Sequence, residues 1–405
     1  MTDCVIPNGY KRTPLGVIPQ EWEVRRFKDV GKFLKNNTLS REKMSENNGC
    51  VQNIHYGDVL IKYNEILNVP KNNIPWIRES KDSTLGDMLR DGDIVISDTA
   101  EDYTVGKATE LLEINGTSLV AGLHTMPFRP LPNLFSPCFL GYYINSMAYR
   151  FQLYPLVQGT KVCAISKKAM SGTFLIIPPL PEQQKIAEII STWNKAIEKQ
   201  SQLIEKLEMR KKGLTQQLLT AKRRLPGFST PWKKVKLGEI CNITTGKLDA
   251  NAMEDNGIYP FFTCAKDVYK INKYAFDTEA LLISGNGEYV GYVHYCKGKF
   301  NAYQRTYVLD RFRDNIFYLK YTLQYYLPKR ILQTKSNSNT PYIVIGTLKY
   351  MIILEPSMAE QTAIAEVLKT ADHEIELAKQ KLELFRQQKH GLMQQLLTGK
   401  KRVKP

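Results

Sequence analysis

The chain contains a long internal repeat. Residues 182–224 align with residues 360–402 without a gap, and 20 of the 43 aligned positions are identical, whereas about 3 identities would be expected from average residue usage. A second, shorter repeat opens each half, because Trp22 and Trp232 each begin the pattern Trp-x4-Phe/Leu-x-Asp/Glu. A chain that repeats in this way is expected to fold as two related halves, since each copy specifies the same local structure.

Each long repeat carries two rows of mostly apolar residues, and the residues of a row lie seven positions apart. Such rows are typical of helices that pair along a coiled-coil seam. The start of each helix is also marked, because Pro181 suits a first helical position and Ser357 with Glu360 has capping-box spacing. The predicted seam consists of Ile186, Ile190, Trp193, Ile197, Ile204, Leu207, Leu214 and Leu218 in the first copy, and of Ile364, Leu368, Ile375, Leu382, Phe385, Leu392 and Leu396 in the second.

These two helices are unusually long. At 1.5 Å per residue, helices of about 38 residues would be roughly 57 Å long, well beyond the globular average. A helix with so long an apolar row needs a partner that covers it. The simplest arrangement pairs the two copies with each other, antiparallel and within one chain. The alternatives are pairing between two chains and two ordinary amphipathic helices in one core.

The remaining segments predict two domains, at residues 1–180 and 225–356, with the helices at 181–224 and 357–405. Apolar runs with the character of buried strands occupy residues 93–97, 173–177, 280–284 and 350–354, and helices are expected at 134–156 and 317–334. The predicted fold class is therefore two α/β (α+β) domains joined by two long helices that form an antiparallel coiled coil, with an internal pseudo-twofold repeat.

The charge of the chain favours a polyanionic partner. Lys and Arg number 56 against 40 Asp and Glu, which gives a formal net charge of +16, enough to attract nucleic acid from a distance. Many basic proteins bind no polyanion, so the charge alone decides nothing. No stretch approaches the roughly 18 apolar residues of a membrane span, the start lacks the order of a signal peptide, and the cysteines show no paired spacing. We therefore expect a cytoplasmic protein with no membrane partner.

The sequence offers little support for catalysis. It has no Gly-x4-Gly-Lys-Ser/Thr string for phosphate binding, and Asn339-Thr340-Pro341-Tyr342 lacks the middle proline of an amino-methyltransferase motif. Asp91, Asp93 and Asp98 resemble a metal-nuclease cluster only loosely, and His294 with Cys296 has no further ligands at metal spacing. We predict no catalytic residue, no metal site and no cofactor in this chain. A methyltransferase or nuclease in its own right remains the alternative, followed by a coiled-coil adaptor with no DNA role.

These features together resemble a known family. Two dissimilar domains, each opened by the Trp pattern and each followed by a helix that starts with Glu-Gln and ends with Gln-Gln-Leu-Leu-Thr, look like the specificity subunit of type I restriction-modification systems. Residues 161–165 and 176–184 are similar to the family's link between recognition domain and spacer helix. The second copy departs from this pattern, because residues 355–361 contain only one proline.

The resemblance implies a function and a set of partners. Each domain would be a target recognition domain that reads one half of an asymmetric, two-part site in double-stranded DNA, and the helices would fix the gap between the halves. The chain would be non-catalytic and would assemble with two methyltransferase subunits and with motor-nuclease subunits, which would bind S-adenosylmethionine, ATP and Mg. Exposed charges on the helices are candidates for gripping the methyltransferase subunits, namely Glu188, Glu198, Lys199, Glu366 and Glu376.

Residues that contact bases are expected on loops beside the recurring landmarks of the two domains, because loops can vary without disturbing the frame. Gln304 and Arg305 are favoured, since their side chains have the geometry for reading base edges. The candidates are Thr99, Glu101, Tyr103, His124 and Lys161 in the first domain and Asn286, Glu288, Gln304, Arg305, Ser338 and Asn339 in the second. Lys107, Lys297 and Lys299 are predicted to contact phosphates rather than bases.

Overall fold

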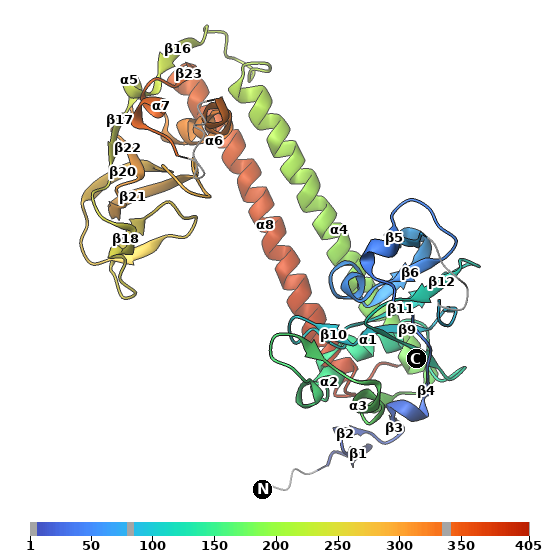
Figure 1. Cartoon of the computed structure of the whole chain (residues 1–405). Helices are drawn as coiled ribbons and strands as arrows, with labels where there is room; N and C mark the ends of the chain where they lie inside the picture. Colours follow the sequence, from blue (N-terminus) through green and yellow to red (C-terminus); the bar gives the residue numbers. More distant parts are fainter. Residues whose placement is uncertain (1–5, 79–84, 334–341, 405) are drawn as a thin grey trace. The chain divides into compact units, whose positions relative to one another are not determined.

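The computed structural model describes residues 6–78, 85–333 and 342–404 (Figure 1). The chain divides into two compact units. The first comprises Met1–Lys199 with Leu382–Pro405, and the second comprises Gln200–Lys381. Each unit therefore contains one domain together with the adjoining parts of both long helices.

The first domain is built on two mixed sheets. One sheet has the order β4-β13-β9-β11-β7, and the other has the order β12-β6-β8-β5. The strands of the first sheet are β4 (Gly31–Phe33), β13 (Thr125–Pro130), β9 (Ile94–Ser97), β11 (Ala108–Leu112) and β7 (Ile66–Asn68). Those of the second are β12 (Leu119–Ala121), β6 (Gln52–Ile54), β8 (Trp76–Ile77) and β5 (Met44–Ser45).

The described part of this domain also contains three antiparallel strand pairs and three short α-helices. The pairs are β1 (Tyr10–Thr13) with β2 (Gly16–Pro19), β3 (Glu23–Arg26) with β15 (Phe174–Ile177), and β10 (Thr99–Ala100) with β14 (Cys163–Ala164). The helices are α1 (Phe139–Asn145), α2 (Met147–Arg150) and α3 (Lys167–Ser171). The sequence predicted one helix at 134–156. Ser146, whose backbone is extended, separates α1 from α2 instead.

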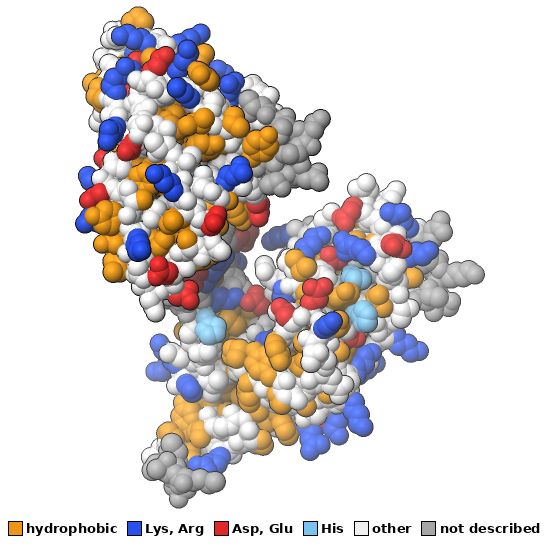
Figure 2. All heavy atoms as spheres, turned by 60° about the vertical axis from the view of Figure 1, so that its left-hand side comes forward, with side chains coloured by type: hydrophobic (Ala, Val, Ile, Leu, Met, Phe, Trp, Pro, Cys, Tyr) orange, Lys and Arg blue, Asp and Glu red, His pale blue; other side chains and the backbone are white. Residues whose placement is uncertain are grey.

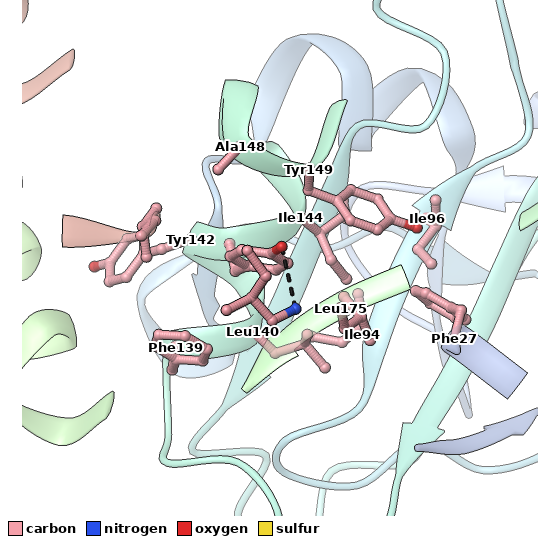
Figure 3. Close-up of a cluster of buried hydrophobic side chains, with 14 of the residues drawn as sticks. Phe27, Ile94, Ile96, Phe139, Leu140, Tyr142, Ile144, Ala148, Tyr149 and Leu175 are labelled. Atoms are coloured by element: carbon pink, nitrogen blue, oxygen red, sulfur yellow. Dashed lines mark hydrogen bonds between the residues drawn. The ribbon is translucent and has the colours of Figure 1, made fainter. Parts of the chain in front are cut away.

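The larger core of the first domain lies between the sheet β4-β13-β9-β11-β7 and these helices. Phe27, Ile94, Tyr149 and Leu175 are fully buried and point toward one another (Figure 3). The Phe27 and Phe128 rings lie 4.4 Å apart between centroids. The strand predicted at 93–97 is thus β9, and its apolar side chains are buried on both faces of the sheet, as a continuous apolar run requires.

The second domain contains one larger sheet with the order β17-β22-β20-β21-β18-β19. Its strands are β17 (Asn242–Thr245), β22 (Thr306–Asp310), β20 (Phe276–Ser284), β21 (Val293–Ala302), β18 (Tyr259–Phe262) and β19 (Tyr269–Ile271). A separate pair joins β16 (Lys233–Lys236) to β23 (Ile352–Glu355), and the helices are α5 (Leu237–Ile240), α6 (Ile316–Gln333) and α7 (Ile345–Lys349). The helix expected at 317–334 corresponds to α6.

The two long helices are α4 (Leu180–Leu219) and α8 (Met358–Leu396). In the first unit they meet where the Trp193 and Phe385 rings pack edge to face, 5.7 Å apart between centroids. In the second unit the Gln200 amide donates to the carbonyl of Ala378 over 3.0 Å. Contacts follow opposite chain directions in each unit, so the predicted antiparallel packing of the two helices within one chain is confirmed.

Every residue of the predicted seam is buried or half-buried. The ends of the seam also pack into the cores of the two domains. Ile186 and Ile190 belong to the core of the first domain together with Leu396. Leu218 belongs to the core of the second domain together with Ile364. Each helix pair is therefore continuous with the core of the domain at which it ends.

The Glu-Gln start of each helix explains why the repeats include Trp and Arg. Glu182 is 1% exposed and accepts from the indole Nε1 of Trp22 (2.8 Å) and from two nitrogens of Arg402 (2.7 and 2.9 Å). The second copy repeats this arrangement with Glu360, Trp232 and Arg224 (Nε1 2.9 Å; guanidinium 2.9 and 2.6 Å). Each carboxylate thus joins the start of one helix, the Trp of its domain and the end of the other helix.

Candidate nucleic-acid interface

The two domains share a set of three backbone hydrogen bonds that the sequence alone does not reveal. In the first domain, Gly122 N donates to Ile54 O (2.8 Å), Asp98 N to His124 O (3.1 Å), and Ile165 N to Asp98 O (2.9 Å). These bonds tie together the loops that follow β6 and β9, the turn before β13, and the end of β14.

The second domain repeats the three bonds with different residues. Tyr303 N donates to Phe262 O (2.9 Å), Gly285 N to Arg305 O (2.8 Å), and Ile343 N to Gly285 O (2.8 Å). The ladders agree as well, because Ser97 pairs with Thr125 and Ser284 pairs with Thr306. His124 and Arg305 therefore occupy the same structural position, one residue before the equivalent strands β13 and β22.

This correspondence defines two matched surfaces. The first platform consists of Tyr56, Asp98, Thr99, His124 and Ala164. The second platform consists of the residues at the equivalent positions, which are Cys264, Gly285, Asn286, Arg305 and Tyr342. The cross-strand pairs complete the match, since Thr99 faces Ala164 and Asn286 faces Tyr342. The backbone is held the same way in both platforms, while all five side chains differ.

The side chains of the first platform form a connected polar cluster. The Asp98 carboxylate accepts from the Thr99 hydroxyl (2.8 Å) and lies 3.3 Å from His124 Nδ1. The Tyr56 ring packs edge to face on the His124 ring, 5.3 Å between centroids. His124 has a φ of 55°, an uncommon backbone conformation for a residue with a side chain. The imidazole is held at its Nδ1 side, and about half of the side chain is exposed.

The second platform is more open. The carbonyl of Arg305 is fixed by Gly285 N and by the Cys264 thiol (3.4 Å). The Arg305 side chain is exposed, and its guanidinium makes no hydrogen bond or ion pair with any residue that the structure describes. The side-chain amide of half-buried Asn286 is likewise unpaired among the described residues. The backbone is fixed while these polar groups remain available.

Several predicted base readers lie at the platforms. Thr99 and His124 belong to the first platform, and Asn286 and Arg305 belong to the second. Lys161 is exposed near the tip of a tight loop that Gln158 and Ala164 close through two backbone hydrogen bonds of 2.9 Å. Ser338 and Asn339 lie outside the described residues.

Other predicted readers lie on the flanks of the platforms. Glu101 is exposed just after β10, and the exposed Tyr103 ring contacts the Tyr154 ring (6.1 Å). Glu288 is exposed in the loop after β20, where its hydrogen bond raises the pKa of the Tyr289 hydroxyl. Gln304, next to Arg305, is exposed but donates to Asp249 (2.9 Å). Gln304 is therefore the less available of the two favoured readers.

The predicted phosphate contacts lie apart from these clusters. Lys107 is half-buried, donates to the carbonyl of Leu60 (2.8 Å), and has a pKa lowered by burial. Lys297 and Lys299 are exposed on β21, directly opposite Glu279 and Asp277 on β20. Carboxylates at those positions oppose the approach of a phosphate, so the attraction of these two lysines for DNA is partly offset.

Six of the ten platform residues were not predicted as base readers from the sequence: Tyr56, Asp98, Ala164, Cys264, Gly285 and Tyr342. Asp98 drew attention only as part of a loose acidic cluster. In the structure Asp93 is bound by Arg129 (2.6 Å) and Asp91 accepts from the backbone of Ile114 (2.8 Å). The signal that finds the missed residues is the backbone pairing of the two domains, which brings segments distant in sequence to one surface.

Net charge alone does not locate the interface. On the face shown in Figure 2, Lys and Arg side chains are scattered over each domain with Asp and Glu between them. The equivalent platforms locate a candidate interface better than charge does, because they combine a repeated backbone frame with polar groups that are open to a ligand.

A family model described as "Type I restriction modification DNA specificity domain" matches residues 19–209 and 229–385. The two matches begin close to the Trp of each half and together cover most of the chain. The chain belongs to this family. The specificity family is one of DNA sequence recognition, so the platforms are candidates for the surfaces that read the bases.

Individual relatives agree with this assignment. The type I restriction enzyme EcoDI specificity subunit of Escherichia coli is 43% identical over 167 residues, which is 41% of this chain and 37% of that relative. A protein of Methanocaldococcus jannaschii, provisionally named type I restriction enzyme MjaX specificity subunit, is 25% identical over 98% of this chain and 97% of its own. The match to the first relative therefore spans well under half of its length, while the match to the second is nearly complete.

A solved structure has the same fold. The S subunit of a type I restriction-modification system from M. genitalium superposes with a TM-score of 0.57 at 16% identity, over 97% of this chain and 98% of that one. In the described part of this chain, no helix combines the length and apolar character needed to cross a membrane.

Proposed function

We propose that this chain reads an asymmetric, two-part site in double-stranded DNA, with one half-site assigned to each domain. The observation that carries the proposal is the pair of platforms, in which one hydrogen-bonded frame presents two different sets of polar side chains. A frame that is kept while its side chains change suits two readers of different sequences. The adaptor alternative gives no reason for such a repeated surface.

The long helices would set the distance between the half-sites. A base pair rises about 3.4 Å, so two readers on one duplex can both engage only when the spacing between them matches the gap in the site. Within each unit the helix pair packs into the core of the domain there, and the proposal requires the helices between the domains to be stiff.

The chain would act as the non-catalytic subunit of a cytoplasmic complex. Two methyltransferase subunits would dock on the outer faces of α4 and α8, where Glu188, Glu366 and Glu376 are exposed and where Glu198 and Lys199 also lie. S-adenosylmethionine would bind to those subunits, and ATP and Mg to the motor-nuclease subunits. The described residues include no group of three or more His, Cys, Asp or Glu side chains placed to hold a metal ion.

The proposal is tested by expressing the chain with its methyltransferase subunit and mapping methylated adenines in the host DNA by single-molecule sequencing. We expect methylation at a two-part motif with a constant gap, lost when this chain is omitted. Methylation that continues unchanged without the chain would refute the reading role and favour the adaptor.

A further inference from the structure

The two platforms differ in chemical character as well as in residue identity. The first platform presents a carboxylate acceptor. Among the described residues, the second oxygen of the Asp98 carboxylate takes no hydrogen bond, and the Nε2 of His124 is also unpaired. The second platform presents the donors of the Arg305 guanidinium together with the Asn286 amide, which can donate and accept, and both groups are unpaired among the described residues.

A carboxylate on a DNA-reading surface needs a compensating donor, because it is otherwise repelled by the phosphates. In the major groove the donors are the amino groups of cytosine (N4) and adenine (N6), and acidic side chains characteristically accept from cytosine N4. Asp98 is part of a fixed cluster in which Thr99 and His124 hold one carboxylate oxygen in place. The remaining oxygen is therefore pre-oriented to accept from a base.

The opposite logic applies to the second platform. Guanine offers two adjacent acceptors, O6 and N7, which match the forked donors of arginine. The guanidinium of Arg305 is not used by a described neighbour, while its backbone is clamped by Gly285 N and the Cys264 thiol. Asn286 lies on the adjoining segment, and its amide suits the N6 and N7 edge of adenine.

We propose that Asp98 and Arg305 determine specificity at equivalent positions of the two domains. Asp98 selects a base with a major-groove amino group in the half-site of the first domain, and Arg305 selects guanine in the half-site of the second. The inference rests on the proposed DNA-reading function and deepens it. Tyr56, packed on the His124 ring, is a positioning residue for the first platform.

The test compares methylation motifs of the assembled complex with Asp98→Ala, Arg305→Ala and Arg305→Lys. Arg305→Ala should relax one guanine in one half-site and leave the other half unchanged. Arg305→Lys should retain only part of the discrimination, because lysine keeps the charge but cannot form the paired contact. Asp98→Ala removes both acceptor oxygens and should relax one adenine or cytosine in the opposite half. Lys299→Ala is the matched control in the second domain, and it should lower methylation without altering the motif.

A base analogue distinguishes a direct contact from an indirect effect. In binding assays with the purified complex, replacing the assigned guanine by 7-deazaguanine removes N7. The analogue should weaken binding by the wild-type complex measurably but leave binding by Arg305→Ala unaffected. On the unmodified wild-type site, Arg305→Ala should bind about 5- to 150-fold more weakly than the wild-type complex. Equal weakening of both complexes by the analogue would overturn the assignment of Arg305.

The outcomes also separate this inference from the proposed function. A wild-type complex that methylates a two-part motif, with variants that keep the same motif, would refute the roles of Asp98 and Arg305 and leave the function intact. Wild-type methylation that does not depend on the chain would refute the function itself. Thermal unfolding of each variant shows whether a lost motif reflects lost folding, and Arg305→Lys then provides the comparison with a preserved charge.

Discussion

At the residue scale, Glu110 is a buried carboxyl that joins β11 to the start of α1 in the first domain. It is 3% exposed on β11, where its carboxylate accepts from the backbone nitrogens of Cys138 (2.6 Å) and Gly141 (2.8 Å) at the start of α1. Burial raises the pKa of this carboxyl from the ordinary 4.5 to about 7, although both hydrogen bonds act in the other direction. The folded first domain thus retains a proton that the unfolded chain gives up near pH 4.5.

This perturbation predicts a pH dependence of stability. Between pH 4.5 and about 7 the folded state binds more protons at Glu110 than the unfolded state, so the free energy of unfolding should fall as pH rises through that window. Glu110→Gln should flatten this decline, whereas Glu113→Gln, at an exposed carboxyl, should not. Thermal unfolding midpoints at several pH values measure the slope. An unchanged slope in Glu110→Gln would contradict the assignment.

Gly285 matters because of a close backbone approach. A Cβ at this position would lie 2.2 Å from the carbonyl oxygen of Arg305. Gly285→Ala should therefore push the turn that carries Arg305 away, at a cost of roughly 1–3 kcal/mol in unfolding free energy, and should weaken reading of the second half-site. Gly213→Ala, in open space on α4, is the control and should be neutral or stabilising. Equal stability of Gly285→Ala and wild type would argue against a fixed second platform.

At the scale of elements, the helix termini depend on residues far away in the chain. Arg402, beyond the end of α8, donates to the buried Glu182 at the start of α4, and that hydrogen bond raises the pKa of the guanidinium. Among the described residues, removing the arginine leaves a buried carboxylate with only the Trp22 indole as a side-chain partner. The last few residues of the chain are thus part of the first domain.

Arg402→Ala should consequently destabilise the first domain. Breaking a fully buried pair costs roughly 3–5 kcal/mol, and the partial exposure of Arg402 reduces this to about 2 kcal/mol. Lys401→Ala removes a neighbouring exposed charge and should leave the unfolding midpoint unchanged. Denaturant unfolding of both variants makes the comparison. Equal midpoints would show that the Arg402–Glu182 pair contributes nothing to the free energy of unfolding.

The elements also show what could be predicted from the sequence. Heptad spacing and the repeated Trp were enough for two domains and an antiparallel helix pair, because both are local patterns. The predicted rows also contain a lysine in each copy, Lys211 and Lys389, at equivalent positions of the repeat. Lys211 pairs with Asp372 on the facing helix, whereas its equivalent Lys389 pairs with Glu65 of the first domain (2.7 Å). Position 194, which corresponds to Asp372 in the repeat, is an asparagine, so Lys389 requires a different partner.

The same limit applies to the platforms. Loop position and side-chain chemistry were sufficient to select Thr99, His124, Asn286 and Arg305, but not Tyr56 or Cys264. Those residues follow β6 and β18, and they reach the platforms only because these strands run parallel to β12 and β21. Pairing between strands so distant in sequence leaves no local signature, so it cannot be derived from a single sequence.

At the scale of the whole molecule, the account requires two different readers whose separation is set by α4 and α8. Gln200 and Ala378 are equivalent positions of the repeat and contact each other. Removing the heptads 197–203 and 375–381 together deletes matching segments around this contact and keeps the seam in phase. Each helix would become about 10 Å shorter, which corresponds to about three base pairs of DNA.

The most direct test is the methylation motif of the complex that carries this double deletion. We predict that both half-sites stay the same and that the gap between them changes by about three base pairs. An unchanged gap with both half-sites intact would contradict the proposal that the helices measure the distance between two DNA readers.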